Sequence, residues 1–129
     1  MSTSVPELRI LIVEDEPLIR WSLSETLSDC GHVVVEAGDA VGALRAVTGV
    51  AAPFDVVLLD FRLPDSNDLA LLARLRGFAA TTRIILMTAY GTPEILQAAL
   101  DLGAHRVISK PFDMNDLAPM VTQAYASGA

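Results

Sequence analysis

Five residues with chemically active side chains stand at or just after the ends of short apolar runs in this chain of 129 residues. Three are acids, one is a threonine and one is a lysine: Glu14, Asp15, Asp60, Thr88 and Lys110. The run VVLL at residues 56–59 shows the pattern, because it stops on Asp60 although burying an unpaired carboxylate is very costly. We therefore expect Asp60 to lie where a buried strand reaches a polar site.

The chemistry of these side chains favours magnesium-assisted phosphoryl transfer. Crowded carboxylates repel one another and resist ionisation, and a hard divalent cation removes that conflict. Mg²⁺ prefers carboxylate oxygens, keeps several of its waters and recruits phosphate oxygens. Lys110 adds a compact positive charge and Thr88 a hydroxyl group, and both suit phosphoryl oxygens. A carboxylate held by a metal and an amine can then act as an in-line nucleophile toward phosphorus.

Strands that end at these residues are predicted by the apolar runs themselves. The runs are rich in Val and Ile and mostly continuous, which is typical of strands buried on both faces of a parallel sheet. Ligands of open α/β sheets bind outside the carboxyl ends of the strands, so the five side chains should gather at one edge. The predicted strands are residues 8–13, 32–37, 55–60, 83–88 and 106–109.

Helices are predicted between the strands from capping and helix-breaking residues. Alternation of five strands and five helices implies an α/β fold, with a parallel sheet, helices on both faces and right-handed crossovers. Pro119 lies inside the fifth pattern, so that helix either starts late, near Asn115 or Asp116, or is kinked. The predicted signals are Pro17 and Gly31 for the first helix, Asp39 for the second, a cap at Ser66, Asn67 or Asp68 and Gly77 after the third, Thr92, Pro93 and Gly103 for the fourth, and about Asp113 to Tyr125 for the fifth.

Composition favours one cytoplasmic domain with a full core. Hydrophobic residues make up 52% and charged residues 19%, which is enough apolar material for a single domain of this length. The net charge of −7 disfavours direct binding to nucleic-acid phosphates or anionic membranes. Cys30 is the only cysteine, which fits a reducing cytoplasm, and we expect no signal peptide and no membrane span.

Four motifs, LIVEDEP, LLDFRLPD, MTAYG and SKPF, occur in this order, each at a predicted strand end. Together they resemble the signature set of response-regulator receiver domains of two-component signalling, over about Leu8 to Tyr125. The resemblance implies one receiver domain, residues 1–129 with a core of about 8–125, and a flavodoxin-like (βα)5 sheet with strand order 2-1-3-4-5.

The same resemblance implies the roles of the site residues. Asp60 is the phosphoacceptor and takes its phosphoryl group from a phosphohistidine. Asp15 and Asp60 bind Mg²⁺, with Glu14 acting through water and the backbone carbonyl of Arg62 as a further ligand. Thr88 and Lys110 bind the phosphoryl oxygens.

The implied partners are a sensor histidine kinase or histidine phosphotransfer protein, and an output domain or downstream protein. The output contact uses the face formed by the fourth helix, fifth strand and fifth helix, and a phosphorylation-dependent homodimer is a further implied form. The stretch TAYG…GAHRVISKPF resembles receivers of the nitrogen-regulator type. A free-standing regulator and a receiver from a longer protein both stay open.

Two other functions are weighed against this one. A phosphohydrolase resembling the haloacid dehalogenase family needs a second Asp two residues after the nucleophile, where this chain has Arg62, and it needs room for a cap domain. A degenerate receiver that binds a partner without phosphorylation is disfavoured by the complete set of acids, Thr and Lys.

Several residues depart from the family pattern or have bland structural expectations. Asp68 replaces a usual Gly, Val107 replaces a common aromatic residue, and Arg62 and Tyr90 flank the path of an attacking water. A cis peptide bond is expected before Pro111 by resemblance. Structural roles are expected for the others: a helix-end charge at Glu16, solvated side chains at His32 and His105, a partly buried Trp21 and a buried Cys30.

Overall fold

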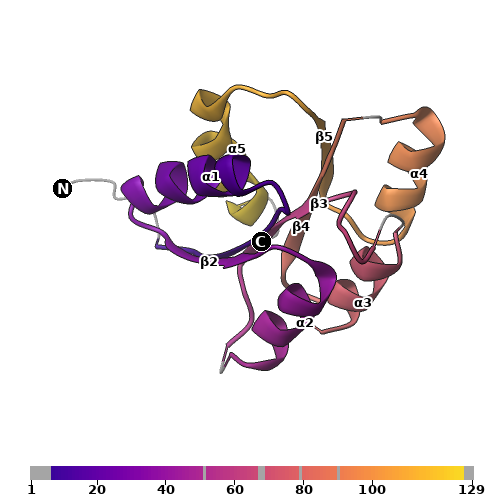
Figure 1. The fold of residues 1–129 in the computed structure, drawn as a ribbon, viewed down its shortest axis with the longest axis horizontal. Helices are drawn as coiled ribbons and strands as arrows, with labels where there is room; N and C mark the ends of the chain where they lie inside the picture. The colour runs from indigo at the N-terminus through magenta and orange to yellow at the C-terminus, as the bar shows by residue number, and fades with distance from the viewer. Residues whose placement is uncertain (1–6, 51, 67–68, 79, 90, 127–129) are drawn as a thin grey trace.

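One parallel sheet of five strands forms the centre of the computed structural model, which describes residues 7–50, 52–66, 69–78, 80–89 and 91–126. The strand order is β2-β1-β3-β4-β5, as the family resemblance implied (Figure 1). Each predicted strand is confirmed to within one residue at its start. The strands are β1 (Arg9–Val13), β2 (Val33–Ala37), β3 (Val56–Asp60), β4 (Arg83–Thr88) and β5 (Arg106–Ser109).

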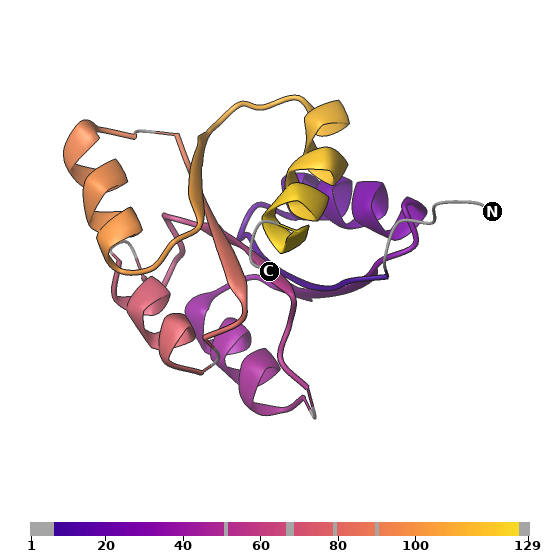
Figure 2. The same cartoon turned by 180° about the vertical axis from the view of Figure 1, so that it is seen from behind.

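The helices cover both faces of this sheet. Helices α1 and α5 lie together on one face, and α2, α3 and α4 lie on the other, as the two opposite views agree (Figure 1 and Figure 2). Their bounds are α1 (Pro17–Asp29), α2 (Ala40–Thr48), α3 (Ala70–Phe78), α4 (Pro93–Asp101) and α5 (Leu117–Ala126), with a short 3-10 helix η1 (Met114–Asp116) before α5.

Alternate residues of the central strands supply two hydrophobic clusters, one on each face. In β1, Ile10 and Ile12 pack on the side of α1 and α5, whereas Leu11 and Val13 pack on the side of α2 and α3. All five residues of β3 are buried, which explains the continuous apolar run. Each such Val, Leu or Ile side chain contributes about 1.5–3 kcal/mol by leaving water.

Capping residues set the starts of α2 and α4 as predicted. The side chains of Asp39 and Thr92 accept hydrogen bonds from Gly42 and Ile95, and Pro93 opens α4. Glu16 has the helix-end role expected of it, because its carboxylate accepts from the backbone N–H of Ile19. For the third helix, Asn67 and Asp68 lie outside the described residues.

Two predictions about the later helices resolve differently. The expectation that Gly77 follows the third helix is wrong, because α3 continues through it to Phe78. The buried leucines of α3, Leu71, Leu72 and Leu75, outweigh the roughly 1 kcal/mol that a helical glycine costs. Pro119 is the third residue of α5, which begins at Leu117, so the late start is confirmed and no kink is needed. In the first turn a backbone N–H has no partner within the helix, and its loss costs little.

Three further expectations about single side chains are wrong. Trp21 is 58% exposed on α1, and Cys30 is exposed just after that helix. His32 is buried rather than solvated, because it packs under the start of β1, where its Nδ1 accepts from the backbone N–H of Leu8 at 3.1 Å. Burial lowers the pKa of His32, and the charge of Glu7 only partly opposes that effect.

Within the described ranges, none of the helices combines the length and the apolar character that a membrane crossing requires.

Candidate functional site

The three predicted acids meet at the carboxyl edge of the two central strands. Val13 of β1 pairs with Leu59 of β3, so the next residues, Glu14 and Asp60, emerge side by side. Asp15 follows Glu14 directly, and ligand oxygens of all three carboxylates lie within 4.8 Å of one another. Parallel pairing, rather than closeness in the chain, therefore builds the acidic cluster.

Lys110 brings a cation to this cluster from the end of β5. Its Nζ lies 2.6 Å from Oε1 of Glu14 and 3.3 Å from Oδ1 of Asp60. Its backbone N–H donates to the carbonyl of Thr88 at 2.8 Å, and the expected cis peptide joins it to Pro111. Burial alone would lower the pKa of Lys110, but Glu14 and Asp60 together outweigh burial and raise it. The amine of Lys110 is therefore positively charged at neutral pH.

Glu14 is the most buried acid of the site, with 1% of its surface exposed. Burial raises the pKa of its carboxyl group, and nearby Asp60 raises it further, although the hydrogen bond from Lys110 acts in the opposite direction. In this cluster one ammonium group lies beside three carboxylates. A hard divalent cation fits this donor set, because oxygen ligands crowded within a few ångströms are what Mg²⁺ binds.

Asp60 presents its two oxygens to different surroundings. The backbone N–H of Arg62 donates to Oδ1 at 3.4 Å, and Nζ of Lys110 contacts the same atom. Both of these contacts fall on Oδ1. The residue is 7% exposed and lies at a cavity of about 210 Å³, far larger than the ~30 Å³ of one water.

The cavity also brings in the two remaining predicted residues. Thr88, the last residue of β4, is 2% exposed and contributes to the lining, as does Arg62. Gly91 lies against this threonine, since a Cβ atom there would stand 3.3 Å from its Cγ2. The lining consists of Glu14, Asp15, Glu16, Ile19, Asp60, Phe61, Arg62, Thr88, Ala89 and Lys110. Of the residues that depart from the family pattern, Asp68 and Tyr90 lie outside the described residues.

Arg20 supports the site although the sequence did not single it out. Its Nη1 donates to the backbone carbonyl of Glu14 at 2.9 Å, and its Nε pairs with Glu36 at 3.3 Å. The guanidinium thereby fastens the acidic turn after β1 to both α1 and β2. An arginine in the helix that follows a pair of acids was the signal available for it.

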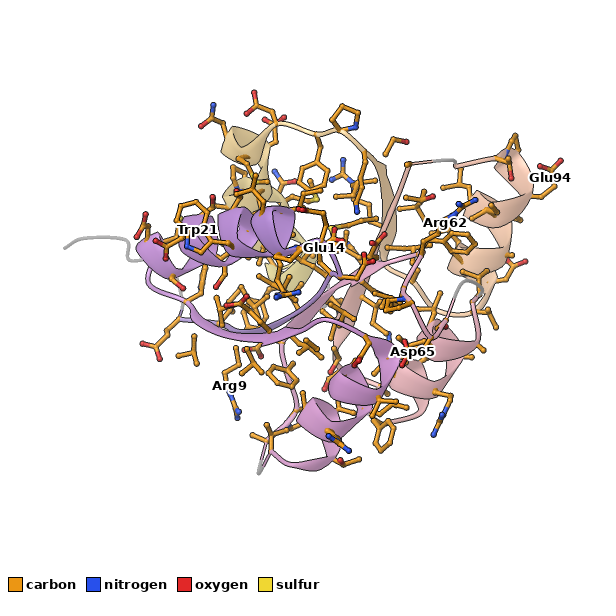
Figure 3. All side chains as sticks on the ribbon, in the orientation of Figure 1. Arg9, Glu14, Trp21, Arg62, Asp65 and Glu94 are labelled. Atoms are coloured by element: carbon orange, nitrogen blue, oxygen red, sulfur yellow. The ribbon has the colours of Figure 1, made fainter. Side chains whose placement is uncertain are left out.

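Asp65 is a second residue that the sequence did not single out. It lies on the loop after Asp60, on which Figure 3 labels Arg62 and Asp65. Its carboxylate accepts from the backbone N–H groups of Ala40 and Val41 in α2. The loop that follows the phosphoacceptor candidate is thus bonded to a helix more than twenty residues earlier in the chain.

Comparison with known proteins gives a consistent result. The protein-family model of the response regulator receiver domain matches residues 10–122 of this chain. Sporulation initiation phosphotransferase F of Bacillus subtilis is 35% identical over 109 residues, which cover 84% of this chain and 86% of that protein. Transcriptional regulatory protein TcrA of Mycobacterium tuberculosis is 37% identical over 113 residues, which cover 88% of this chain but 44% of that protein. The chain thus spans most of one curated relative and less than half of another.

Solved structures agree with the fold. A CheY-like response regulator receiver domain protein from Methanospirillum hungatei has a TM-score of 0.88 and 28% identity, covering 95% of this chain and 97% of the other. NtrX from Brucella abortus, solved with ADP, has a TM-score of 0.83 and 32% identity, covering 95% of this chain and 27% of the other.

Proposed function

The chain belongs to the response regulator receiver domain family, and from that membership we propose that Asp60 is the carboxylate that accepts the phosphoryl group. Receivers are the phosphoacceptor domains of two-component signalling, which is therefore the function of this chain. The observation that carries the assignment is that Asp60 ends a central strand within reach of Lys110 and two further acids. Glu14 and Asp15 are acidic as well, but both follow the end of β1, whereas Asp60 is itself the last residue of the central strand β3.

The proposed transfer uses the geometry of Asp60 directly. An oxygen of the carboxylate attacks the phosphorus of a phosphohistidine, the new O–P bond forms, and the P–N bond breaks as the imidazole leaves. We assign the attack to Oδ2, because Oδ1 already contacts the N–H of Arg62 and the amine of Lys110. Thr88 and Lys110 would then donate to the phosphoryl oxygens and stabilise charge on them.

A divalent ion would be held by this chain's acids. Asp15 and Asp60 would bind Mg²⁺ directly, Glu14 through water, and the Arg62 carbonyl would be a further ligand. When bound, the ion neutralises developing charge on the phosphoryl oxygens. The crowding of three carboxylates, with ligand oxygens within 4.8 Å of one another, supports this assignment, because a hard divalent cation favours such a donor set.

The phosphohydrolase alternative gains no support from the site. Its second acid would stand two residues after Asp60, and Arg62 occupies that place. A degenerate receiver is also disfavoured, because Glu14, Asp15, Thr88 and Lys110 all line the same cavity as Asp60. We therefore propose phosphorylation, rather than binding alone, as the input to this domain.

The proposed donor is a sensor histidine kinase or a histidine phosphotransfer protein in the cytoplasm. The proposed recipient is an output domain or a separate protein at the face formed by α4, β5 and α5, through which a phosphorylated homodimer would also form. Val107 of β5 stands where many receivers carry a switching aromatic ring, and it is partly buried against the core. A stiff, β-branched valine has no ring to turn, so we propose that the loop after Thr88 carries the change.

Mass spectrometry after incubation with acetyl phosphate and Mg²⁺ tests the assignment. The wild type should gain one phosphoryl group, and Asp60→Asn should gain none. Asp55→Asn is a matched control, because Asp55 directly precedes β3 at the end opposite to Asp60 and its carboxylate accepts from the N–H of Arg9. Phosphorylation of Asp60→Asn at the wild-type rate would remove Asp60 from its role.

Hydrogen exchange with and without beryllofluoride, a mimic of the acyl phosphate, tests the proposed switch. We expect changed protection over residues 88–95 and a smaller change over 115–120. Unchanged exchange in both segments, at saturating ligand, would exclude signalling through that face.

A further inference from the structure

We propose that Asp65 is a positioning residue for the phosphoacceptor site, because it fastens the loop after Asp60 to the amino end of α2. The inference rests on the proposed function of Asp60. It assigns to Asp65 no contact with the metal or the phosphoryl group. Its role is to hold the backbone that contacts the Asp60 carboxylate.

The two carboxylate oxygens of Asp65 accept hydrogen bonds from two adjacent backbone N–H groups. Oδ1 accepts from Ala40 at 2.7 Å, and Oδ2 accepts from Val41 at 3.1 Å. These N–H groups belong to the first turn of α2, where they have no acceptor within the helix and where the helix dipole favours negative charge. The hydrogen bond from Ala40 is the main reason why the pKa of Asp65 is lowered.

Capping of α2 does not by itself account for Asp65, because α2 has a cap of its own. Asp39 precedes the helix, and its Oδ1 accepts from Gly42 at 2.7 Å. Asp65 comes from a different loop, 24 and 25 residues further along the chain. Its bonds therefore join two segments, whereas the bond from Asp39 stays within one.

The loop that Asp65 holds is short and internally closed. Leu63 and Ser66 exchange two backbone hydrogen bonds, of 2.7 and 3.2 Å, and Asp65 lies within the turn that these bonds close. Leu63 is buried at 6% exposure in the cluster beneath α2 and α3. Leu63 therefore anchors the start of the turn in the core, and the bonds of Asp65 hold the rest of the turn against α2.

Only Phe61 and Arg62 separate this turn from Asp60. The N–H of Phe61 is fixed to the carbonyl of Met87 at 2.8 Å, so Arg62 is the residue that takes up any displacement of the turn. Its N–H contacts Oδ1 of Asp60 at 3.4 Å, a long bond that a small shift would break. Releasing Asp65 should therefore weaken the Arg62 contact, which leaves Lys110 to hold Oδ1 of Asp60, and should misplace the Arg62 carbonyl.

Removing a residue that orients metal ligands without touching the metal typically lowers the metal affinity 10- to 100-fold. Asp65 is exposed and acts through two residues, so we expect the low end, about tenfold, for Asp65→Ala. Asp65→Asn keeps one oxygen for one of the two N–H groups and should lose only part of that affinity.

The matched control is Asp39→Ala, which removes a cap from the same helix but leaves the loop after Asp60 tied. Both alanine variants should melt lower than wild type by similar amounts. Calorimetric titration of each variant with Mg²⁺ should show weaker binding for Asp65→Ala, by about tenfold, and less than twofold change for Asp39→Ala. Equal Mg²⁺ affinity in the two variants would overturn the proposal, and Asp65→Asn decides the same question if Asp65→Ala does not fold.

Amide exchange of Arg62, Leu63 and Ser66 separates this inference from the proposed function. Faster exchange in Asp65→Ala, but not in Asp39→Ala, supports the tether even if the wild type proves not to bind Mg²⁺, a result that would refute the proposed function alone. Unchanged exchange at these three amides would refute the tether, whatever the metal does.

Discussion

Replacing Lys110 by methionine should destabilise the metal-free protein much more than it destabilises the protein in Mg²⁺. The substitution keeps an unbranched side chain of similar length and removes the charge that contacts Glu14 and Asp60. The exposed fraction is 18% for the Lys110 side chain, 1% for Glu14 and 8% for Asp60, so these ion pairs are largely removed from water. Removing one partner from a buried pair leaves an uncompensated charge.

The magnitude follows from that burial. Breaking a buried ion pair costs about 3–5 kcal/mol, and the opening of this site to the cavity places Lys110→Met at about 3 kcal/mol. For a domain of this length, about 3 kcal/mol lowers Tm by roughly 12 °C. Mg²⁺ stabilises both proteins, so it reduces the difference between them only to the extent that the variant binds the ion more tightly. Loss of the Lys110 charge leaves the carboxylates less compensated, so we expect tighter binding by the variant, and a 100-fold lower Kd would remove about 2.7 kcal/mol of the difference at saturating Mg²⁺.

The loss of stability caused by Lys110→Met should also be smaller at acidic pH. Burial already raises the pKa of Glu14 above its ordinary value of 4.5, and Lys110 opposes that rise. Without the lysine the folded-state pKa should rise further. Protonation of Glu14 then stabilises the fold of the variant, fully below about pH 4.5 and progressively less as pH rises through the raised pKa.

Thermal melts in EDTA and in Mg²⁺, at pH 7 and pH 5, provide the assay. The double variant Lys110→Met/Glu14→Gln is the control, because it removes both members of the pair and should regain much of the lost stability. Two results would refute the reasoning: a single variant that melts with wild type in EDTA, or a double variant no more stable than the single one.

Three further predictions concern other parts of the molecule. Arg62→Ala should shorten the lifetime of the phosphorylated state by widening the path of the attacking water, as measured by mass spectrometry over time. An equal or longer lifetime would contradict the steric argument. Tyr90, which we expect to flank the same path, lies outside the described residues. Since burial lowers the pKa of His32 below its ordinary 6.5, the free energy of unfolding should fall as pH drops from 6.5, because the unfolded state binds the proton more tightly. His32→Asn, which keeps an acceptor for Leu8, should flatten that dependence in urea titrations at pH 7 and pH 5, and an unchanged slope would exclude His32 as its source. Pro119→Ala should change stability by less than about 1 kcal/mol in urea unfolding, because a first-turn proline lacks the ~3 kcal/mol cost of an interior one; a gain near that value would show that the helix is strained.

Local patterns in the chain were enough to predict the strands, most helix starts and the residues at the strand ends. Continuous apolar runs mark strands covered on both faces, and the residue that ends such a run must face the edge of the sheet. Asp60 follows VVLL, and all five residues of β3 are buried. Caps such as Asp39 and Thr92 act within three residues of themselves, so their partners could be predicted without a fold.

Contacts between distant segments depend on how the sheet is assembled, and tertiary structure decided them. Lys110 and Glu14 lie 96 residues apart, and although the strand ends predicted a shared edge of the sheet, the direct contact between these two side chains came only from the assembled sheet. The same holds for Asp65, whose bonds to Ala40 and Val41 look from the sequence like ordinary turn chemistry. Burial of His32 and exposure of Trp21 also escaped prediction, because residue type sets only an average burial, whereas the packing of α1 against β1 and β2 sets the actual one.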